Sequence, residues 1–175
     1  MMFKIIIIVI CIVVLLFGFV VFRGAPYVPS KRRDIKRAFT ALYPLGGSDV
    51  LVDIGSGDGV VLRAAAKQGA RAVGYELNPI LVLLSQWLSR KYTAITIKLA
   101  DFWLTSLPSD VTVVYVFGES RDINKMAKKV AREAVKQGRS IAFISYGFTL
   151  RDAVPVKTVG PHHLYRFDPL QSKEA

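Results

Sequence analysis

Three acidic residues of this chain, Asp53, Glu76 and Asp101, each stand at or just after the end of a strongly apolar segment. A glycine-rich stretch, residues 55–59, follows the first of these segments. Carboxylates accept hydrogen bonds from hydroxyl and amino groups, and they attract cations. The chemistry that this pattern favours is therefore the binding of a polar, positively charged ligand.

The glycine-rich stretch reads Gly55-Ser56-Gly57-Asp58-Gly59, a turn in which the backbone can approach a ligand closely. Nicotinamide-binding turns, with the pattern G-x-G-x-x-G, present helix N–H groups to a negatively charged pyrophosphate. Here Asp53 precedes the turn and Asp58 lies within it, and two carboxylates would repel a pyrophosphate. They suit a ligand that bears an ammonium and a sulfonium, which favours S-adenosylmethionine as the cofactor.

Glu76 and Asp101 would bind the nucleoside part of such a ligand. Glu76 can accept hydrogen bonds from both ribose hydroxyls, a role that would serve NAD equally well. Asp101 can accept a hydrogen bond from an adenine amino group while Phe102 or Trp103 covers a face of the base. The alternative, that each acid only caps a helix or a turn, fits one acid better than three at consecutive segment ends.

The apolar segments alternate with amphipathic ones, which predicts strands and helices in turn. The predicted strands are residues 49–54, 70–76, 94–100, 111–117 and 140–145, with weaker ones at 155–159 and 163–167. The predicted helices are one from Lys31 that ends before Gly46, and those at residues 60–68, 79–90 and 121–137. Strands this apolar predict an α/β fold, a Rossmann-like, doubly wound, mostly parallel sheet covered on both faces. Ligands of such sheets bind beyond the carboxyl ends of the strands, where the three acids lie.

Two of the predicted helices have further features. The helix over residues 121–137 has an apolar stripe and an opposite basic face, formed by Lys125, Lys128, Lys129, Arg132 and Lys136. This basic face is predicted to be solvated, because a nucleic-acid groove would have aromatic or arginine side chains between the lysines. Trp87 falls on the apolar stripe of the helix over residues 79–90, so it is predicted to lie in the core.

An unbroken apolar run, residues 5–22, lies between Lys4 and Arg23. At about 1.5 Å per residue a helix of this length reaches roughly 27 Å, close to the ~30 Å hydrocarbon thickness of a bilayer. The alternative is a cleaved signal peptide, whose apolar region is usually about 7–15 residues long and ends in a small-residue cleavage site. The run is predicted to be a single-pass transmembrane anchor, residues 1–23. A connector and amphipathic helix at 24–47 and a main domain at 48–175 follow it.

Basic residues dominate the sequence just after this run: Arg23, Lys31, Arg32, Arg33, Lys36 and Arg37. They predict that the main domain lies on the cytoplasmic side of the membrane, or on the matrix side in an organelle of bacterial descent. The same residues could equally contact anionic lipid.

Composition adds three limits. The 175 residues suffice for one domain, and the net charge of +11 favours anionic surroundings. A single cysteine, Cys11, excludes an intramolecular disulfide and a cysteine-cluster zinc site. His162 and His163 are adjacent in a predicted strand and would point to opposite faces, so no metal site is predicted.

Five segments carry a resemblance to a known family: PYVPS at 26–30, LVDIGSGDG at 51–59, AVGYELNP at 72–79, DFW at 101–103 and VFG at 116–118. They resemble class I, seven-strand methyltransferases that depend on S-adenosylmethionine. More narrowly, the chain is similar to the membrane-anchored lysine methyltransferases that modify the c-ring protein of ATP synthase and the adenine nucleotide translocase.

The resemblance implies a cofactor pocket at the strand ends, with the connector folding over it as a lid. The candidate cofactor-binding residues are Tyr27, Pro29, Ser30, Asp53, Gly55, Ser56, Gly57, Asp58, Gly59, Glu76, Leu77, Asp101 and Phe102. Tyr27 and Glu119 are the candidate catalytic residues, which would orient the methyl acceptor. Glu119 could instead be an acid favoured at a helix N-terminus.

Two functions fit these observations. The first is a membrane-anchored methyltransferase that acts on lysine of a membrane protein, with a small-molecule or lipid acceptor as a variant. The second is a non-catalytic module that binds the cofactor and uses its basic surface to hold nucleic acid or an acidic partner.

Overall fold

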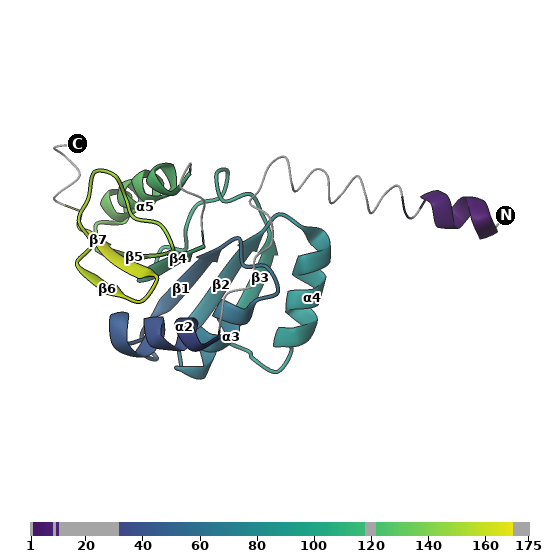
Figure 1. Cartoon of the computed structure of the whole chain (residues 1–175), viewed down its shortest axis with the longest axis horizontal. Coiled ribbons are helices and arrows are strands. Elements are labelled where there is room, and N and C mark those ends of the chain that lie inside the picture. Colours follow the sequence, from purple (N-terminus) through teal and green to yellow (C-terminus); the bar gives the residue numbers. More distant parts are fainter. Residues whose placement is uncertain (1, 9, 11–31, 118–121, 170–175) are drawn as a thin grey trace.

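The computed structural model describes residues 2–8, 10, 32–117 and 122–169, and a seven-stranded sheet forms their centre (Figure 1). The strands are β1 Val50–Ile54, β2 Arg71–Glu76, β3 Ile95–Leu99, β4 Val113–Val116, β5 Ile141–Tyr146, β6 Lys157–Val159 and β7 His162–Phe167. Their order across the sheet is β3-β2-β1-β4-β5-β7-β6. The predicted α/β class and all seven predicted strands are confirmed.

Parallel pairing brings the candidate acids to one edge of the sheet. Strands β3, β2, β1, β4 and β5 pair in parallel, and β7 is antiparallel to β5 and β6. The chain passes from β1 to β2 in one direction across the sheet and later returns to β4 on the other side of β1. This reversal makes the carboxyl ends of β1 and β4 the switch point at which such sheets bind ligands.

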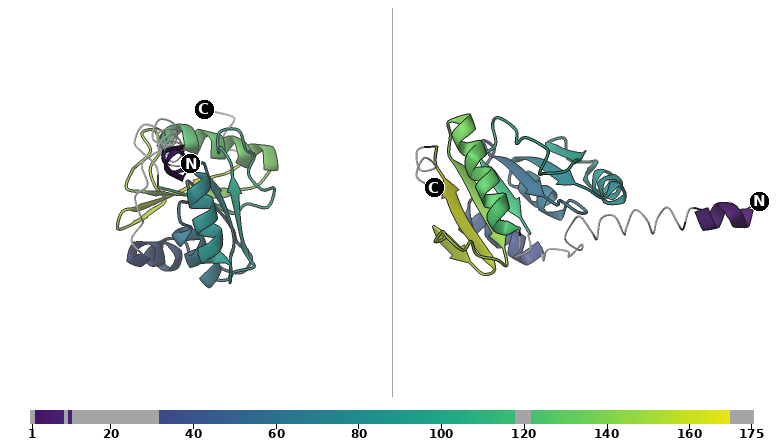
Figure 2. Two further views of the ribbon diagram at one scale, coloured as in Figure 1. Left: turned by 90° about the vertical axis from the view of Figure 1, so that its right-hand side faces the viewer. Right: turned by 90° about the horizontal axis from the view of Figure 1, so that it is seen from above.

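Helices cover the sheet on both faces (Figure 2). They are α2 Arg32–Arg37, the π-helix η1 Ala38–Leu42, α3 Val60–Lys67, α4 Pro79–Ser89 and α5 Ile123–Gln137. One core cluster joins α2, η1 and α3 to alternate strand residues, and a second joins α5 to the residues that point the other way. This two-sided burial explains why the central strands are apolar on both faces.

The apolar stripe predicted after Lys31 is confirmed. Ile35, Ala38, Phe39 and Leu42 are all buried, with at most 3% of their surface exposed. The segment begins as an α-helix and continues as a π-helix, and Tyr43 N–H donates to Ala38 O. The predicted cap and start of α4 are also confirmed, because the Asn78 side chain accepts hydrogen bonds from the first turn.

Two predictions about helix faces are wrong. Trp87 was expected in the core, yet 60% of its surface is exposed, because α4 is apolar on several sides and buries a different one. Lys129 was expected on a solvated face, yet it is half-buried and donates hydrogen bonds to three backbone carbonyls. The edge strand β3 also departs from expectation, since none of its residues is fully buried.

Several predicted features fall outside the described residues. Residues 2–8 are helical, but residues 11–22 of the predicted anchor, the connector with Tyr27, Pro29 and Ser30, and Glu119 are not described. Among the described residues, no helix is both long enough and apolar enough to cross a bilayer.

Candidate functional site

Asp53 lies in the middle of the sheet near its carboxyl edge. It pairs in register with Gly74 of β2 and Tyr115 of β4, and only 3% of its surface is exposed. Burial raises the pKa of Asp53 well above its usual value, and the negative charges of Glu76 and Asp58 raise it further. Three carboxyl groups therefore share one strongly negative region that a cation would relieve.

Glu76 holds the glycine-rich turn in place. Its Oε2 accepts a hydrogen bond of 2.8 Å from Gly57 N–H, and its Oε1 accepts one of 2.8 Å from Asn78 N–H. A carboxylate has about four acceptor positions, so two remain for other donors. The backbone thus fixes the Glu76 carboxylate in one orientation before any ligand arrives.

The turn needs glycine for two separate reasons. Gly57 and Gly59 have φ values of +53° and +79°, a region that other residues rarely adopt. At Gly59 a Cβ atom would also lie 2.3 Å from Ser85 Oγ of α4. The turn can therefore pack tightly against α4 only with glycine at this position.

Asp58 is partly neutralised by Arg63, a residue that the sequence analysis did not single out. Arg63 Nη2 lies 3.3 Å from Asp58 Oδ2, and Arg63 Nη1 donates to Asp58 O at 2.5 Å. Asp58 Oδ1 also accepts from Val60 N–H at 3.1 Å. Asp58 therefore helps to start α3, which leaves Asp53 and Glu76 as the carboxylates without a basic partner among the described residues.

The third acid, Asp101, opens a loop that α5 holds down. Asp101 Oδ1 accepts a hydrogen bond of 2.8 Å from Trp103 N–H. Lys129 donates to the carbonyls of Phe102, Trp103 and Thr105, and its Nζ lies 4.6 Å from the centre of the Phe102 ring. Phe102 is buried at 5% exposure whereas Trp103 is 42% exposed, so Trp103 has the accessible ring.

Lys129 is a second residue that the sequence analysis missed as part of the site. Desolvation lowers its pKa, and the nearby charges of Glu133 and Asp101 oppose that effect. Its spacing on the helix gave no signal, because only the folded loop brings the three carbonyls to it. Residues 100–112 form no helix, so this ammonium takes the part of a packing element there.

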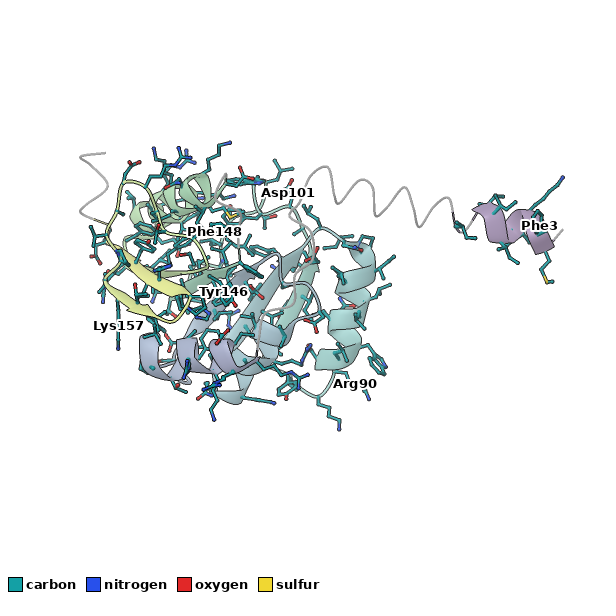
Figure 3. The ribbon with its side chains drawn as sticks, in the orientation of Figure 1. Phe3, Arg90, Asp101, Tyr146, Phe148 and Lys157 are labelled. Atoms are coloured by element: carbon teal, nitrogen blue, oxygen red, sulfur yellow. The ribbon has the colours of Figure 1, made fainter. Side chains whose placement is uncertain are left out.

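The other half of the carboxyl edge, at β4 and β5, is aromatic. The rings of Phe117 and Tyr146 meet edge to face at 4.5 Å, and Tyr146 also packs edge-on against His162 at 4.8 Å. Tyr146 Oη donates to Asp34 Oδ2 of α2 at 3.4 Å. Partial burial, and then the Asp34 charge, raise the pKa of Tyr146. Figure 3 labels Tyr146 near the middle of the domain and Asp101 toward the edge that carries the glycine turn.

His162 stays neutral within this aromatic group. Its Nε2 shares a hydrogen bond of 3.0 Å with Tyr115 Oη, and burial lowers its pKa to about 4. His163 lies on the other face of β7, beside Thr158. Within the described part of the chain, no three His, Cys, Asp or Glu side chains gather as they would around a metal ion.

These residues fit S-adenosylmethionine better than a dinucleotide. A pyrophosphate would meet the buried, unpaired Asp53 and Glu76, whereas an ammonium or sulfonium would lower the energy of both. Glu76 keeps two acceptor positions for ribose hydroxyls, and Asp101 keeps one carboxylate oxygen without a bond in the described structure. Of the predicted cofactor residues, the structure brings together all those between Asp53 and Phe102.

Comparison with known proteins supports this chemistry. The profile of the family described as "ANTKMT methyltransferase domain" matches residues 53–157, from the buried acid to the start of β6. The chain belongs to this family. The match covers the glycine turn, all three acids and the aromatic half of the edge, and it confirms the resemblance seen in the sequence motifs.

Two relatives illustrate the family. The chain is 38% identical over 120 residues to the Homo sapiens lysine N-methyltransferase that is named for the c-ring protein of ATP synthase, covering 67% of this chain and 50% of that one. It is 33% identical over 139 residues to the adenine nucleotide translocase lysine N-methyltransferase of Mus musculus, covering 77% and 58%. The chain thus spans little more than half the length of these relatives.

A solved structure shares most of the domain. An RNA methyltransferase from Salinibacter ruber, crystallised with S-adenosyl-L-homocysteine, is 27% identical with a TM-score of 0.68. The similarity covers 80% of this chain and 92% of that one. The 23S rRNA methyltransferase ErmE, at 16% identity and a TM-score of 0.55, shares the fold alone.

Proposed function

We propose that this chain is an S-adenosylmethionine-dependent methyltransferase that modifies lysine of a membrane protein. The observation that carries this proposal is the buried Asp53 beside Glu76, in the turn that the family profile covers. The named activities of the relatives favour lysine as the acceptor. When bound, the cofactor supplies an activated methyl group with a good leaving group, so the protein has chiefly to align the acceptor.

The chain's own residues then divide the work along the carboxyl edge. Asp53 attracts the positive charge of the cofactor, Glu76 accepts from its ribose, and the loop at Asp101 to Trp103 borders its base. Lys129 keeps that loop in position. Alignment of this kind is worth roughly 7–11 kcal/mol of an activation barrier.

A lysine acceptor must also lose a proton before it reacts. Its reference pKa of about 10.4 means that the neutral amine costs roughly 4.6 kcal/mol at pH 7. Tyr146 and Asp34 are suited to receive the ammonium, because an aromatic face and a carboxylate both attract a cation. Asp34 can then hold the proton through Tyr146 Oη. Tyr27 and Glu119, which lie outside the described residues, remain candidates for orienting the amine.

Membrane attachment is part of the proposal. The side chains of Ile5 to Ile8 lie in a helical stretch and are 45–57% exposed, as they would be in contact with lipid. The apolar run of residues 5–22 would hold the domain beside its substrate and raise the local concentration of acceptors in the same bilayer. The basic residues that follow the run favour the cytoplasmic or matrix side.

Calorimetric titration of the full chain in detergent tests the cofactor. S-adenosylmethionine should bind and NAD should not, and binding of NAD alone would refute the assignment. Membranes incubated with the chain and a labelled methyl donor then test the acceptor. Label that protease removes and ribonuclease leaves is expected. Label that ribonuclease removes would favour an RNA acceptor, which the Salinibacter ruber structure makes the second candidate.

A further inference from the structure

Helix α4 has its apolar and polar residues the wrong way round for a helix that faces water. Its buried residues are Val82, Ser85 and Ser89, so two serines lie against the domain. Leu83 and Trp87, four residues apart on the outside, are 67% and 60% exposed. A helix on the surface of a soluble domain normally turns its polar side outward.

The exposed residues form one continuous surface, the α4 face, which consists of Ile80, Leu83, Leu84 and Trp87. Residues three or four apart are neighbours on a helix, and all four side chains are at least 39% exposed. In the left view of Figure 2, α4 stands at the front of the domain. Leu99, on the edge strand beside α4, adds another apolar side chain at 60% exposure.

The rim of the α4 face is basic. The guanidinium carbon of Arg90 lies 4.8 Å from the centre of the Trp87 ring, and exposed Lys91 and Lys98 follow in the chain. Residues 77–100 contain no acidic residue at all. Figure 3 labels Arg90 at the end of α4 that points away from Asp101.

We infer that the α4 face lies in the headgroup region of an anionic phospholipid bilayer. An amphipathic helix with Trp and Leu on one side and basic residues at its rim is the kind that binds in the plane of a membrane surface. Tryptophan and basic residues are also enriched where protein crosses from lipid to water. A protein partner would need acidic groups to match this rim, and phospholipid supplies them over a whole surface.

The connectivity of the chain allows this contact. The apolar run ends at Phe22 and α2 begins at Arg32, and ten residues can reach at most about 33–36 Å. Helix α2 packs on α3, and α3 contacts α4 through Arg63 and Ser89, 3.5 Å apart. The α4 face is therefore within reach of a bilayer that the apolar run enters. Contact there would bring the nearby glycine turn close to acceptors at the membrane surface.

The chain's only tryptophans, Trp87 and Trp103, provide the test. The full chain is reconstituted in vesicles of phosphatidylcholine and phosphatidylglycerol, with and without bromine on the acyl chains, which quenches tryptophan on contact. With Trp103→Phe, the remaining Trp87 should lose emission in brominated vesicles and emit at shorter wavelength. With Trp87→Phe, Trp103 should keep its emission. An unquenched Trp87, or equal quenching of both tryptophans, overturns the inference.

A matched pair of substitutions tests the surface itself. In the Trp103→Phe background, Leu83→Gln should reduce the quenching of Trp87, whereas Leu104→Gln, at a leucine that is 87% exposed outside α4, should leave it unchanged. Vesicles without phosphatidylglycerol should quench less. A blue shift that depends on protein concentration and comes without quenching would mean that a second copy of the chain covers the face, which also overturns the inference.

Discussion

Replacing Asp53 with asparagine separates the effect of the buried carboxyl group on stability from its effect on ligand binding. The folded chain raises the pKa of Asp53 well above its ordinary value of 3.8 by burial and by the charges of Glu76 and Asp58. The native state therefore keeps a proton that the unfolded chain releases. The stability that this proton contributes is fully present below pH 3.8 and is lost as the pH rises through the raised pKa.

Asparagine has no proton to lose, so the free energy of unfolding of Asp53→Asn should rise relative to the wild type across this window. Within it the difference changes by up to about 1.4 kcal/mol per pH unit. Urea titrations at a series of pH values measure it. An equal pH dependence for both proteins would refute the assigned pKa shift.

Cofactor binding should change in the opposite direction. Two opposite unit charges about 5 Å apart attract by about 3 kcal/mol at an effective dielectric constant of about 20, which is roughly a hundredfold in affinity. Asp53→Asn should lose affinity for S-adenosylmethionine on that scale by calorimetry. Asp110→Asn is the matched control, because Asp110 is 55% exposed and paired with Arg71 at the other edge of the sheet. A stabilised variant that binds as tightly as the wild type would refute the electrostatic reasoning.

Three further substitutions test other parts of the edge. Gly59→Ala should lower the free energy of unfolding in urea by more than about 1 kcal/mol, because it adds strain at φ +79° and a clash with Ser85, whereas Gly138→Ala, also at positive φ, adds strain without a close neighbour. Lys129→Met should cost about 1–3 kcal/mol by leaving carbonyls unpaired, and it should weaken S-adenosylmethionine binding in calorimetry; unchanged affinity would show that the loop does not touch the cofactor. Tyr146→Phe should lower kcat and alter its pH profile while cofactor affinity stays the same, and an unchanged profile would remove Tyr146 from proton transfer.

The sheet and its acids could be predicted because both depend on local pattern. Apolar runs such as residues 49–54 and 111–117 have no polar side to expose, so burial on both faces was the natural interpretation. Parallel strands then put Asp53, Glu76 and Asp101 at one edge without further information. The cap at Asn78 followed from residue types alone.

The errors arose where a helix meets something distant in sequence. The side of α5 that carries Lys129 was clear, but a loop 24–27 residues earlier in the chain covers it only in the folded structure. For α4 the difficulty was different, since leucine and tryptophan occur on most sides. Hydrophobic pattern then cannot choose the buried side, and the close approach of Ser85 to Gly59 chooses it instead.

The carboxyl edge has two chemically different halves, and this difference separates cofactor from acceptor. At β1 and β2 the side chains are acidic and lack basic partners among the described residues, so a permanent cation binds there at low cost and an apolar group would not. At β4 and β5 the rings of Phe117 and Tyr146 stand beside one carboxylate, Asp34. Such a surface can hold an amine in its charged or its neutral form, which a methyl acceptor must adopt in turn. The same edge therefore favours a fixed positive charge on one side and a titrating one on the other.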